Sequence, residues 1–405
     1  MTNIEVVQRV NLKDIYRRLL RSIDKTVAFF DLKFLEKDIS QKFSARRSLC
    51  FGTMGIYPFL VIWTMSQYTD DYVHMIYCLT TLGVFFSVIT RLHSIAYNSY
   101  KSREIYKEMN KAFERMETIP HIRSIFEKYL LISEKVFIAT KMILLPSGLL
   151  LPLSSVMLFL WNGEKVLPYE FYIPWINPKT TSGFLVKLET FAFQMLNTKI
   201  VLDVILCTDA YFFCQMILGI GHLEVLRKYL SDFDAIVREG EIQQDREAVK
   251  EIIKRIVVEQ QSHYKIMRSF ESFYSLQGLV IILAQTIVLI IVIFVIMSKF
   301  WLQGFGFVFV SLGNMFAVTL TGTLFTISCE KFEQAIYNCK WYCLPADFQF
   351  NFIVILRAAQ YPVKPTMGGI LPMELATFVV VFLHKKCLYR NYVAVQLFAL
   401  TLMEK

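Results

Sequence analysis

Charged residues are scarce in this chain of 405 residues. They make up 19% of the sequence, whereas about a quarter of an ordinary soluble protein is charged. The sequence also lacks a recognisable Ser/His/Asp set, a group of Cys and His at metal-ligand spacing, and a phosphate-binding loop. These absences argue against an enzyme, and we expect neither a cofactor nor a bound metal.

The N-terminal region lacks the apolar core of a cleavable signal peptide. Its Arg and Lys residues alternate with acids and isolated apolar residues, and the apolar run 27–30 is short. The first long apolar segment is therefore expected to direct membrane insertion itself. Leu19 and Ile23 belong to a set of apolar residues at helical spacing, which predicts an amphipathic helix before that segment.

Apolar residues are what the chain has in abundance. Hydrophobic residues make up 55% of it, 35 residues are Phe, and the mean hydropathy is +0.44. Several apolar runs approach the roughly 20 residues that a helix needs to cross a bilayer. These features predict an all-α integral membrane protein. The net charge of +9 is spread between the apolar runs, which indicates membrane orientation and argues against nucleic-acid binding.

The apolar pattern predicts six membrane spans before residue 329. Lys and Arg are frequent before the first span and in segment 91–135, but absent from the loop 67–72. Because basic residues favour the cytosolic side, we expect a cytosolic N-terminus and, after a seventh span, an extracellular C-terminus. The expected spans are 49–65, 73–89, 136–161, 191–220, 279–297 and 305–328.

This layout divides the chain into four parts. The expected parts are cytosolic N-terminal helices at 1–48; transmembrane helices one to six at 49–328, with cytosolic helical extensions at 91–135 and 222–276; cytosolic anchor helices at 329–367; and a seventh, pore-side transmembrane helix with an atypical tail at 368–405.

The segment leading into the seventh helix is predicted to be broken. Pro345 suits the first position of a helix, Asp347 its positive end and Arg357 its last turn, which predicts a helix over 346–360. Its length of about 22 Å is too short to cross a bilayer. Apolar residues on one stripe, Phe348, Phe352, Ile355 and Ala359, predict packing against neighbouring helices.

After this helix, two glycines favour a reversal of the chain. Gly368 and Gly369 tolerate the backbone conformations that tight turns need, and Pro372 is expected to restart an apolar helix through Phe378.

The order of these residues resembles the C-terminal signature of insect odorant receptors. The residues that carry the resemblance are Gly322, Ala335-Ile336-Tyr337, Trp341-Tyr342, Arg357-Ala358-Ala359-Gln360-Tyr361-Pro362, Gly368-Gly369 and Thr377-Phe378. A second stretch, Asp209 with Phe212 and then 222–226, is similar to the fourth helix of that family.

The resemblance implies a subunit of a ligand-gated, nonselective cation channel in the plasma membrane of olfactory sensory neurons. In this family four subunits surround a pore formed by their seventh helices, and the inner ends of helices four to seven hold the tetramer together. A tuning subunit binds the odorant and a common co-receptor subunit completes the heterotetramer. The chain resembles a tuning subunit, because it lacks the long inner-loop insertion of the co-receptor. Its expected partners are the co-receptor, a small volatile ligand and the lipid membrane.

A small apolar odorant is expected to bind in a cavity between helices two, three, four and six. Pro146, Gly148 and Pro152 interrupt the outer half of the third span and favour a cavity there, and the loop 162–188 is expected to cover its mouth. The fifth span is expected to face lipid on most sides. The predicted ligand-binding residues are Tyr77, Thr81, Val156, Met157, Trp161, Met195, Phe309, Ser311 and Leu312.

Other residues are expected to act in the pore, in assembly or in the fourth span. Charges at membrane depth are costly, so Lys199, Asp203 and Asp209 should face protein, and the first two can pair across one helical turn. The resemblance implies pore-facing positions at Val380 and Val381, and assembly contacts at Tyr337, Trp341, Tyr342, Arg357 and Pro362.

Three alternatives remain open. A gustatory receptor would carry a different seventh-helix motif, which 392–398 matches only loosely, and basic residues at 384–390 interrupt the apolar run that either kind of receptor needs. A G-protein-coupled receptor would place its N-terminus outside and carry an Asp-Arg-Tyr triplet after the third span. A transporter would show paired broken helices in two repeated halves, but the sequence has a single break.

Overall fold

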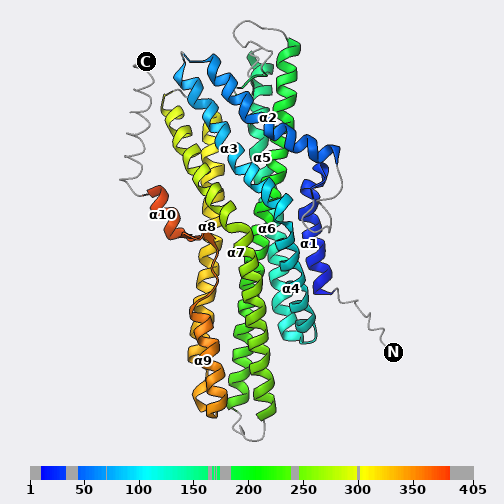
Figure 1. Ribbon diagram of the computed structural model, residues 1–405, viewed down its shortest axis with the longest axis vertical. Helices are drawn as coiled ribbons and strands as arrows, with labels where there is room; N and C mark the ends of the chain where they lie inside the picture. The colour runs from blue at the N-terminus through cyan, green and yellow to red at the C-terminus, as the bar shows by residue number, and fades with distance from the viewer. Residues whose placement is uncertain are drawn as a thin grey trace, which may run out of the picture.

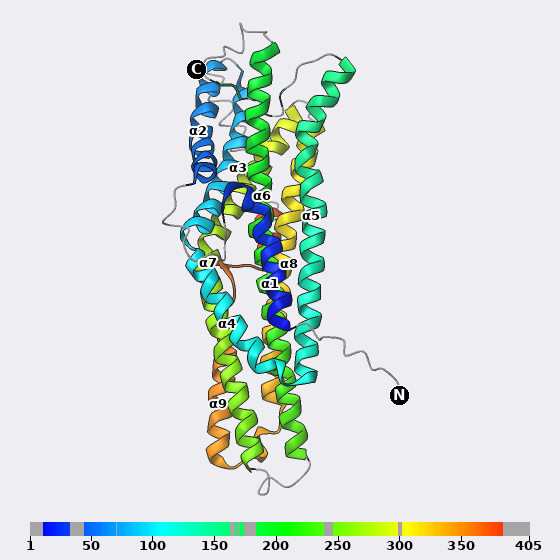
Figure 2. The same cartoon turned by 90° about the vertical axis from the view of Figure 1, so that its right-hand side faces the viewer.

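The computed structural model describes residues 11–32, 44–69, 71–162, 167, 169, 171–173, 184–238, 246–298 and 302–383. These residues form an elongated bundle of helices that run along the long axis of the molecule (Figure 1). The helix α2 lies in the upper half and α9 at the lower end, in both views (Figures 1 and 2). The elements in order are α1 (Leu12–Val27), η1 (Ala28–Phe30), α2 (Ala45–Gln67), α3 (Tyr72–Tyr97), α4 (Ser99–Glu117), α5 (Pro120–Asn162), α6 (Phe184–Arg238), α7 (Arg246–Ser298), α8 (Leu302–Asn338), η2 (Trp341–Cys343), α9 (Ala346–Gln360), β1 (Thr366–Met367), β2 (Leu371–Pro372) and α10 (Leu375–Leu383).

Six helices of the described part are long and apolar enough to cross a membrane. They are α2, α3, α5, α6, α7 and α8, and each contains one of the six predicted spans. The helix α7 has 53 residues, so it is about 80 Å long at 1.5 Å per residue. The hydrocarbon core of a bilayer is only about 30 Å thick. Helix α7 is therefore much longer than a single crossing of the bilayer requires.

The helix α6 is the centre of the bundle. Val204, Phe212 and Leu218 along it are fully buried, and α5, α8, α7 and α1 all pack against it. The amphipathic N-terminal helix that the sequence predicts is α1: Leu19 and Ile23 are buried against the bundle. One apolar core thus runs through the molecule, as expected for helices that bury an apolar stripe against each other.

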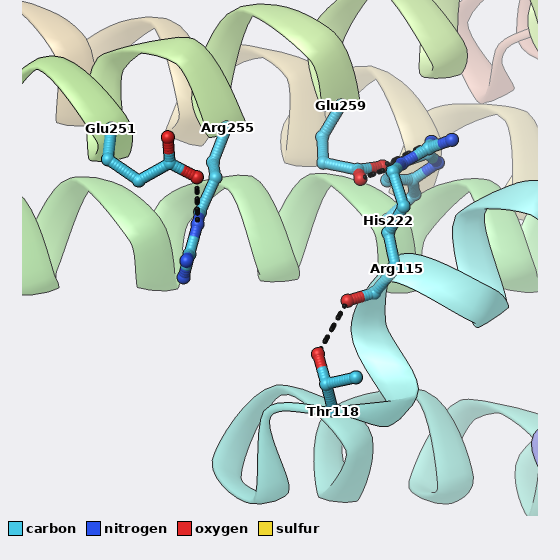
Figure 3. Close-up of polar contacts among 6 residues, drawn as sticks. All are labelled: Arg115, Thr118, His222, Glu251, Arg255 and Glu259. Carbon is cyan, nitrogen blue, oxygen red and sulfur yellow. Dashed lines mark hydrogen bonds and ion pairs between the residues drawn. The ribbon is translucent and has the colours of Figure 1, made fainter.

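A buried carboxylate of α7 contacts side chains from two other helices (Figure 3). Glu259 accepts hydrogen bonds from Arg115 of α4, at 2.5 Å from Nε and 3.0 Å from Nη2, and lies 3.2 Å from Nε2 of His222 in α6. His222 is completely buried and its ring packs edge-on to His263, 5.3 Å away. Residues of three helices, α4, α6 and α7, therefore meet at a single acid.

The short helix α9 has the bounds that the sequence predicts. Its four stripe residues, Phe348, Phe352, Ile355 and Ala359, are all buried. Pro345 occupies the N-cap rather than the first helical position, with an extended backbone (φ −56°, ψ 152°). The helix packs on α8 and α7, and Gln260 of α7 donates a hydrogen bond to its Ile355 carbonyl at 3.1 Å.

The predicted helix start at Pro372 is wrong. Residues 366–367 and 371–372 instead form a small antiparallel hairpin, with Thr366 paired to Pro372. The expected reversal at Gly368 and Gly369 is confirmed, since both have positive φ, of 68° and 73°. Helix α10 begins at Leu375 because the residues before it are used in strand pairing. The interruption at 384–390 and the tail beyond it lie outside the described residues.

The hairpin and α10 are held between α7 and α8. The carboxylate of Glu271 accepts the Thr366 backbone N–H at 2.8 Å and its hydroxyl, and the Gly368 N–H donates to the Ser275 carbonyl at 2.9 Å. On the other side, the hydroxyl of Thr323 in α8 accepts the Leu375 N–H at 2.8 Å. The segment that leads into the seventh span is therefore fastened to both helices.

Candidate ligand-binding cavity

A cavity of about 700 Å³ lies between six helices of the upper half. This volume is within the range of small-molecule sites. The helices α3, α5, α6 and α8 line it where the sequence predicts a cavity between helices two, three, four and six. Most of the lining is apolar. The aliphatic and aromatic part consists of Val84, Leu144, Leu150, Met157, Trp161, Val201, Leu202, Ile205, Val288, Phe307 and Val310.

Two glycines allow the helices around the cavity to approach closely. A Cβ added at Gly148 of α5 would lie 2.0 Å from Cδ2 of Leu202 in α6. One added at Gly83 of α3 would lie 2.2 Å from Cγ2 of Val288 in α7. The predicted interruption of the third span is only partly right, because α5 runs unbroken through Pro146 and Pro152. The cavity nevertheless opens beside this segment, where Ser147 and Gly148 line it.

The described part of the loop before α6 folds onto the cavity. Tyr169 lines it, and Gln194 of α6 donates hydrogen bonds to the carbonyls of Tyr169 at 2.8 Å and Phe171 at 3.0 Å. The Phe171 ring packs edge-on against Tyr57 of α2, with centroids 5.0 Å apart. These contacts fix the loop against the bundle, as expected for a segment that covers a pocket.

The polar groups of the cavity are neutral. None of its lining residues in the described part of the chain is charged. The polar lining residues, which carry hydroxyl, phenol or amide groups, are Tyr57, Thr81, Ser87, Ser147, Tyr169, Asn197, Thr198, Gln285, Ser311 and Asn314.

The structure brings four of the predicted ligand-binding residues together and leaves the others elsewhere. Thr81, Met157, Trp161 and Ser311 line the cavity. Phe309 is 76% exposed and points away from the bundle interior.

The remaining predicted residues do not line the cavity either. Val156 is exposed, whereas Met195 and Leu312 are partly buried, the latter against the main core. The side chain of Tyr77 lies outside the described part of the structure. The binding roles of all nine residues stay predictions.

Two helices that line the cavity, α2 through Tyr57 and α7, are absent from the sequence-based prediction. Asn197 of α6 and Gln285 of α7 both line the cavity, together with Val288. Helix α7, whose span is expected to face lipid on most sides, packs on α3 with one side and lines the cavity with another. A lone amide in an apolar run, as Gln285 is within 279–297, is the signal that could have identified this side.

A buried ion pair lies next to the cavity. Arg91 of α3 is fully buried and donates to the carboxylate of Asp209 and the hydroxyl of Thr208, both in α6. These residues follow the lining residues Ser87 and Ile205 by one helical turn. The prediction that Asp209 faces protein is confirmed, and so is the pair of Lys199 with Asp203, at 2.6 Å.

The residues predicted for assembly are mostly exposed. Tyr337, Tyr342 and Arg357 are exposed, whereas Trp341 and Pro362 are partly buried. Helix α9 also exposes apolar residues that do not belong to its buried stripe. These are Phe350, Ile353 and Val354, followed by Tyr361 after the helix end.

The predicted pore residues are described only in part. Val380 of α10 is 60% exposed. The side chain of Val381 is outside the described part of the structure. The pore roles of both residues stay predictions.

The chain matches known proteins of one kind. A family model described as 7tm Odorant receptor matches residues 57–382. Two solved structures of the insect olfactory receptor OR5 from Machilis hrabei, one of them in complex with eugenol, have a similar fold. The structure with eugenol gives a TM-score of 0.74 and the other 0.75; each is 14% identical, over 95% of this chain and 98% of that chain.

Proposed function

The chain belongs to the 7tm odorant receptor family, and we propose that it binds a small, neutral, volatile ligand in the cavity between its helices. Membership, together with six helices of the described part that are long and apolar enough to cross a membrane, supports a multi-pass membrane receptor. The observation that carries the proposal is the uncharged, largely apolar cavity of about 700 Å³. Burial of an apolar ligand there is favourable, since it removes apolar surface from water. That OR5 from Machilis hrabei has been solved with eugenol supports a small-molecule ligand.

Ligand binding is coupled to a cation-conducting pore in this proposal. Helix α8 lines the cavity with Ser311 and Asn314 and, further along, contacts the segment that leads into the seventh span through Thr323. If the cavity closes better around the ligand in the open state, binding shifts the population toward that state. Val380 and Val381 of α10 then face the pore.

The proposed channel is a heterotetramer of this tuning subunit and a co-receptor in the plasma membrane of olfactory sensory neurons. Its N-terminus is cytosolic and its C-terminus extracellular. The exposed apolar face at the lower end supports assembly, because exposed apolar patches of this kind mark protein interfaces. The residues that contribute to the proposed contact are Tyr337, Trp341, Tyr342, Arg357 and Pro362, all of which are at least partly exposed.

Whole-cell recording tests the proposal. Cells express the chain alone, a co-receptor alone, or both, and are exposed to a broad panel of volatile compounds. A rapid cation current that needs both chains and persists when G-protein signalling is blocked is the expected result. Silence of the pair toward the whole panel, with both chains at the cell surface, contradicts it.

A further inference from the structure

The cavity has exposed lining residues on one helix. Leu150, Met157 and Trp161 of α5 line it and are 54%, 56% and 85% exposed. Every other lining residue of the described chain is buried or partly buried. A side chain that lines a cavity and keeps more than half of its surface accessible lies at an opening. The cavity therefore opens sideways along α5, which lies at the edge of the bundle in Figure 2.

The three rim residues follow one stripe of their helix. Met157 follows Leu150 by two helical turns, and Trp161 follows Met157 by one, so all three project from the same face of α5. From Leu150 to Trp161 the rim is about 16 Å long at 1.5 Å per residue. It belongs to the half of the third span, 136–161, that leads to the loop before α6.

The surface beside the opening is apolar. Leu149, Leu153 and Leu160 of α5 are exposed there, and the sequence 142–161 contains no charged residue. Helix α5 is also one of the helices that are long and apolar enough to cross a membrane. Such a face contacts the hydrocarbon chains of the lipid, so the opening faces hydrocarbon rather than water.

The described part of the loop before α6 contributes no exposed residue to the cavity lining. Tyr169 lines the cavity and is only partly exposed. Gln194 of α6 donates to the Tyr169 carbonyl at 2.8 Å. The Tyr172 N–H donates to the Thr64 hydroxyl of α2 at 3.0 Å. This part of the loop is thus fastened to α2 and α6, whereas the exposed rim is on α5.

We propose that ligands enter this cavity from the hydrocarbon core of the bilayer, through the opening lined by Leu150, Met157 and Trp161. The inference rests on the proposed function and narrows the ligand class to neutral compounds that dissolve in lipid. Each CH2 group of a ligand favours its transfer out of water by about fourfold, so the bilayer concentrates an apolar ligand beside the opening. A charged compound is excluded from this route because the hydrocarbon core does not solvate its charge.

A photoreactive phospholipid tests the opening without an active ligand. The probe carries a phenyldiazirine at the end of one acyl chain, so it cannot leave the bilayer. The receptor, purified with its co-receptor in lipid nanodiscs, is irradiated, and mass spectrometry identifies the labelled residues. We expect label on Val84 of α3 and Val201 of α6, which line the cavity. We expect none on Val204 and Phe212 of α6, which are fully buried outside the lining.

One substitution narrows the opening and a matched one does not. Met157→Trp enlarges a rim residue, whereas Leu160→Trp enlarges an exposed residue of the same helix that does not line the cavity. Label on Val84 and Val201 should fall at least about tenfold in Met157→Trp and stay unchanged in Leu160→Trp.

The time course of the current tests the route itself. A barrier in the entry path slows entry and exit alike, whereas a lost contact mainly speeds exit. For the first active compound of the volatile panel, rise and decay of the current should both slow about tenfold in Met157→Trp, with the half-maximal concentration within about threefold. Leu160→Trp should keep the native time course.

The outcomes keep the entry route apart from the proposed function. Label on Leu153 and Leu160 but not on Val84 or Val201 overturns the opening, as a neighbouring subunit that covered α5 would also do. A native time course in Met157→Trp overturns the route while the receptor function stands. If no volatile compound produces a current, the proposed function fails and the entry route with it, even where the labelling has shown the opening.

Discussion

At the scale of single residues, Glu259 has an environment that differs sharply from that of Glu251 on the same helix (Figure 3). The carboxylate of Glu259 is 3% exposed and has partners on two other helices, whereas Glu251 is 52% exposed and pairs with Arg255 one turn away. Both acids lie in the part of α7 that precedes its membrane span at 279–297. Burial raises the pKa of Glu259, but hydrogen bonds from His222 and Arg115 outweigh it and hold this pKa below its ordinary value.

The first prediction compares these two acids. Glu259→Ala leaves Arg115 and His222 without their carboxylate in the core, and should lower the free energy of unfolding by about 3 kcal/mol. Glu251→Ala removes an exposed pair within one helix and should cost less than about 1 kcal/mol. Thermal unfolding of the purified receptor in lipid nanodiscs measures both changes, and equal costs would contradict the role given to Glu259.

The same environment fixes how this stability depends on pH. The folded-state pKa of Glu259 is lowered, so its contribution is present at neutral pH. It is lost as the pH falls through the lowered folded-state value. The difference in melting temperature between the native chain and Glu259→Ala should therefore shrink in acid.

The sequence predicts that charged residues within the spans face protein, but it does not predict which residue from a distant segment pairs with each of them. The cost of a charge at membrane depth is enough to place Asp209 against protein. Arg91 lies 118 positions earlier in the sequence, and its pairing with Asp209 depends on how α3 packs against α6. The paired Lys199 and Asp203 could be predicted because both belong to one helical turn.

At the scale of elements, α8 is the link between the cavity and the segment that enters the seventh span. Gly322 allows the closest contact, because a Cβ at this position would lie 1.7 Å from the Met373 carbonyl oxygen. Beside it, the Thr326 hydroxyl donates to Glu374 at 2.9 Å, and the ring of Phe316 packs edge-on to Phe378. Displacement of this segment would uncouple the cavity from the proposed pore.

The second prediction tests this contact with a single methyl group. Gly322→Ala must push the Met373 backbone away, so the ligand-evoked current should fall at least about tenfold at unchanged surface expression. Gly313→Ala on the same helix meets no atom within 4 Å and should leave the current unchanged. A normal current in Gly322→Ala would show that the contact is dispensable for gating.

Long helices are predictable from the sequence, whereas the hairpin is not. A long apolar run in the sequence predicts each of the six long helices. Helix α9 is predicted by its apolar stripe, which includes Phe348 and Phe352, and by Pro345, Asp347 and Arg357 at its ends. The strands 366–367 and 371–372 are too short to show a two-residue period. Their pairing depends on Glu271 and Ser275 of α7, which no local pattern near Pro372 reveals.

At the scale of the whole molecule, the lower end carries an apolar surface that the buried stripe of α9 does not explain. Ile353 and Val354 are exposed there although they are strongly apolar. In the proposed heterotetramer they contact a neighbouring subunit.

The third prediction follows from this surface. The double variant Ile353→Asp and Val354→Asp should reduce co-purification with the co-receptor and leave this chain as a smaller species in size-exclusion chromatography. Asn351→Asp places one charge at an exposed polar position of the same helix and should not change assembly. A full-size complex of the double variant would exclude this face from the interface.

The cavity's position was predictable in outline, but its lining depends on the packing of the whole bundle. Prolines and a glycine in the third span indicated where α5 would leave space. The rotation of each helix about its axis decides that Ser311 lines the cavity while Phe309, two residues earlier, is exposed. That rotation is set by contacts between distant segments, so no single apolar run contains it.

The most direct measurement fills the cavity with a side chain. Gly306 of α8 lines the cavity and Gly313 of the same helix is exposed outside it, and a Cβ at either meets no atom within 4 Å. Gly306→Phe should place a ring in the space for the ligand, and Gly313→Phe a ring outside the bundle. With the co-receptor present and surface expression matched, we predict that the ligand-evoked current is lost in Gly306→Phe and kept in Gly313→Phe. An unchanged dose–response curve in Gly306→Phe would contradict a ligand site in this cavity.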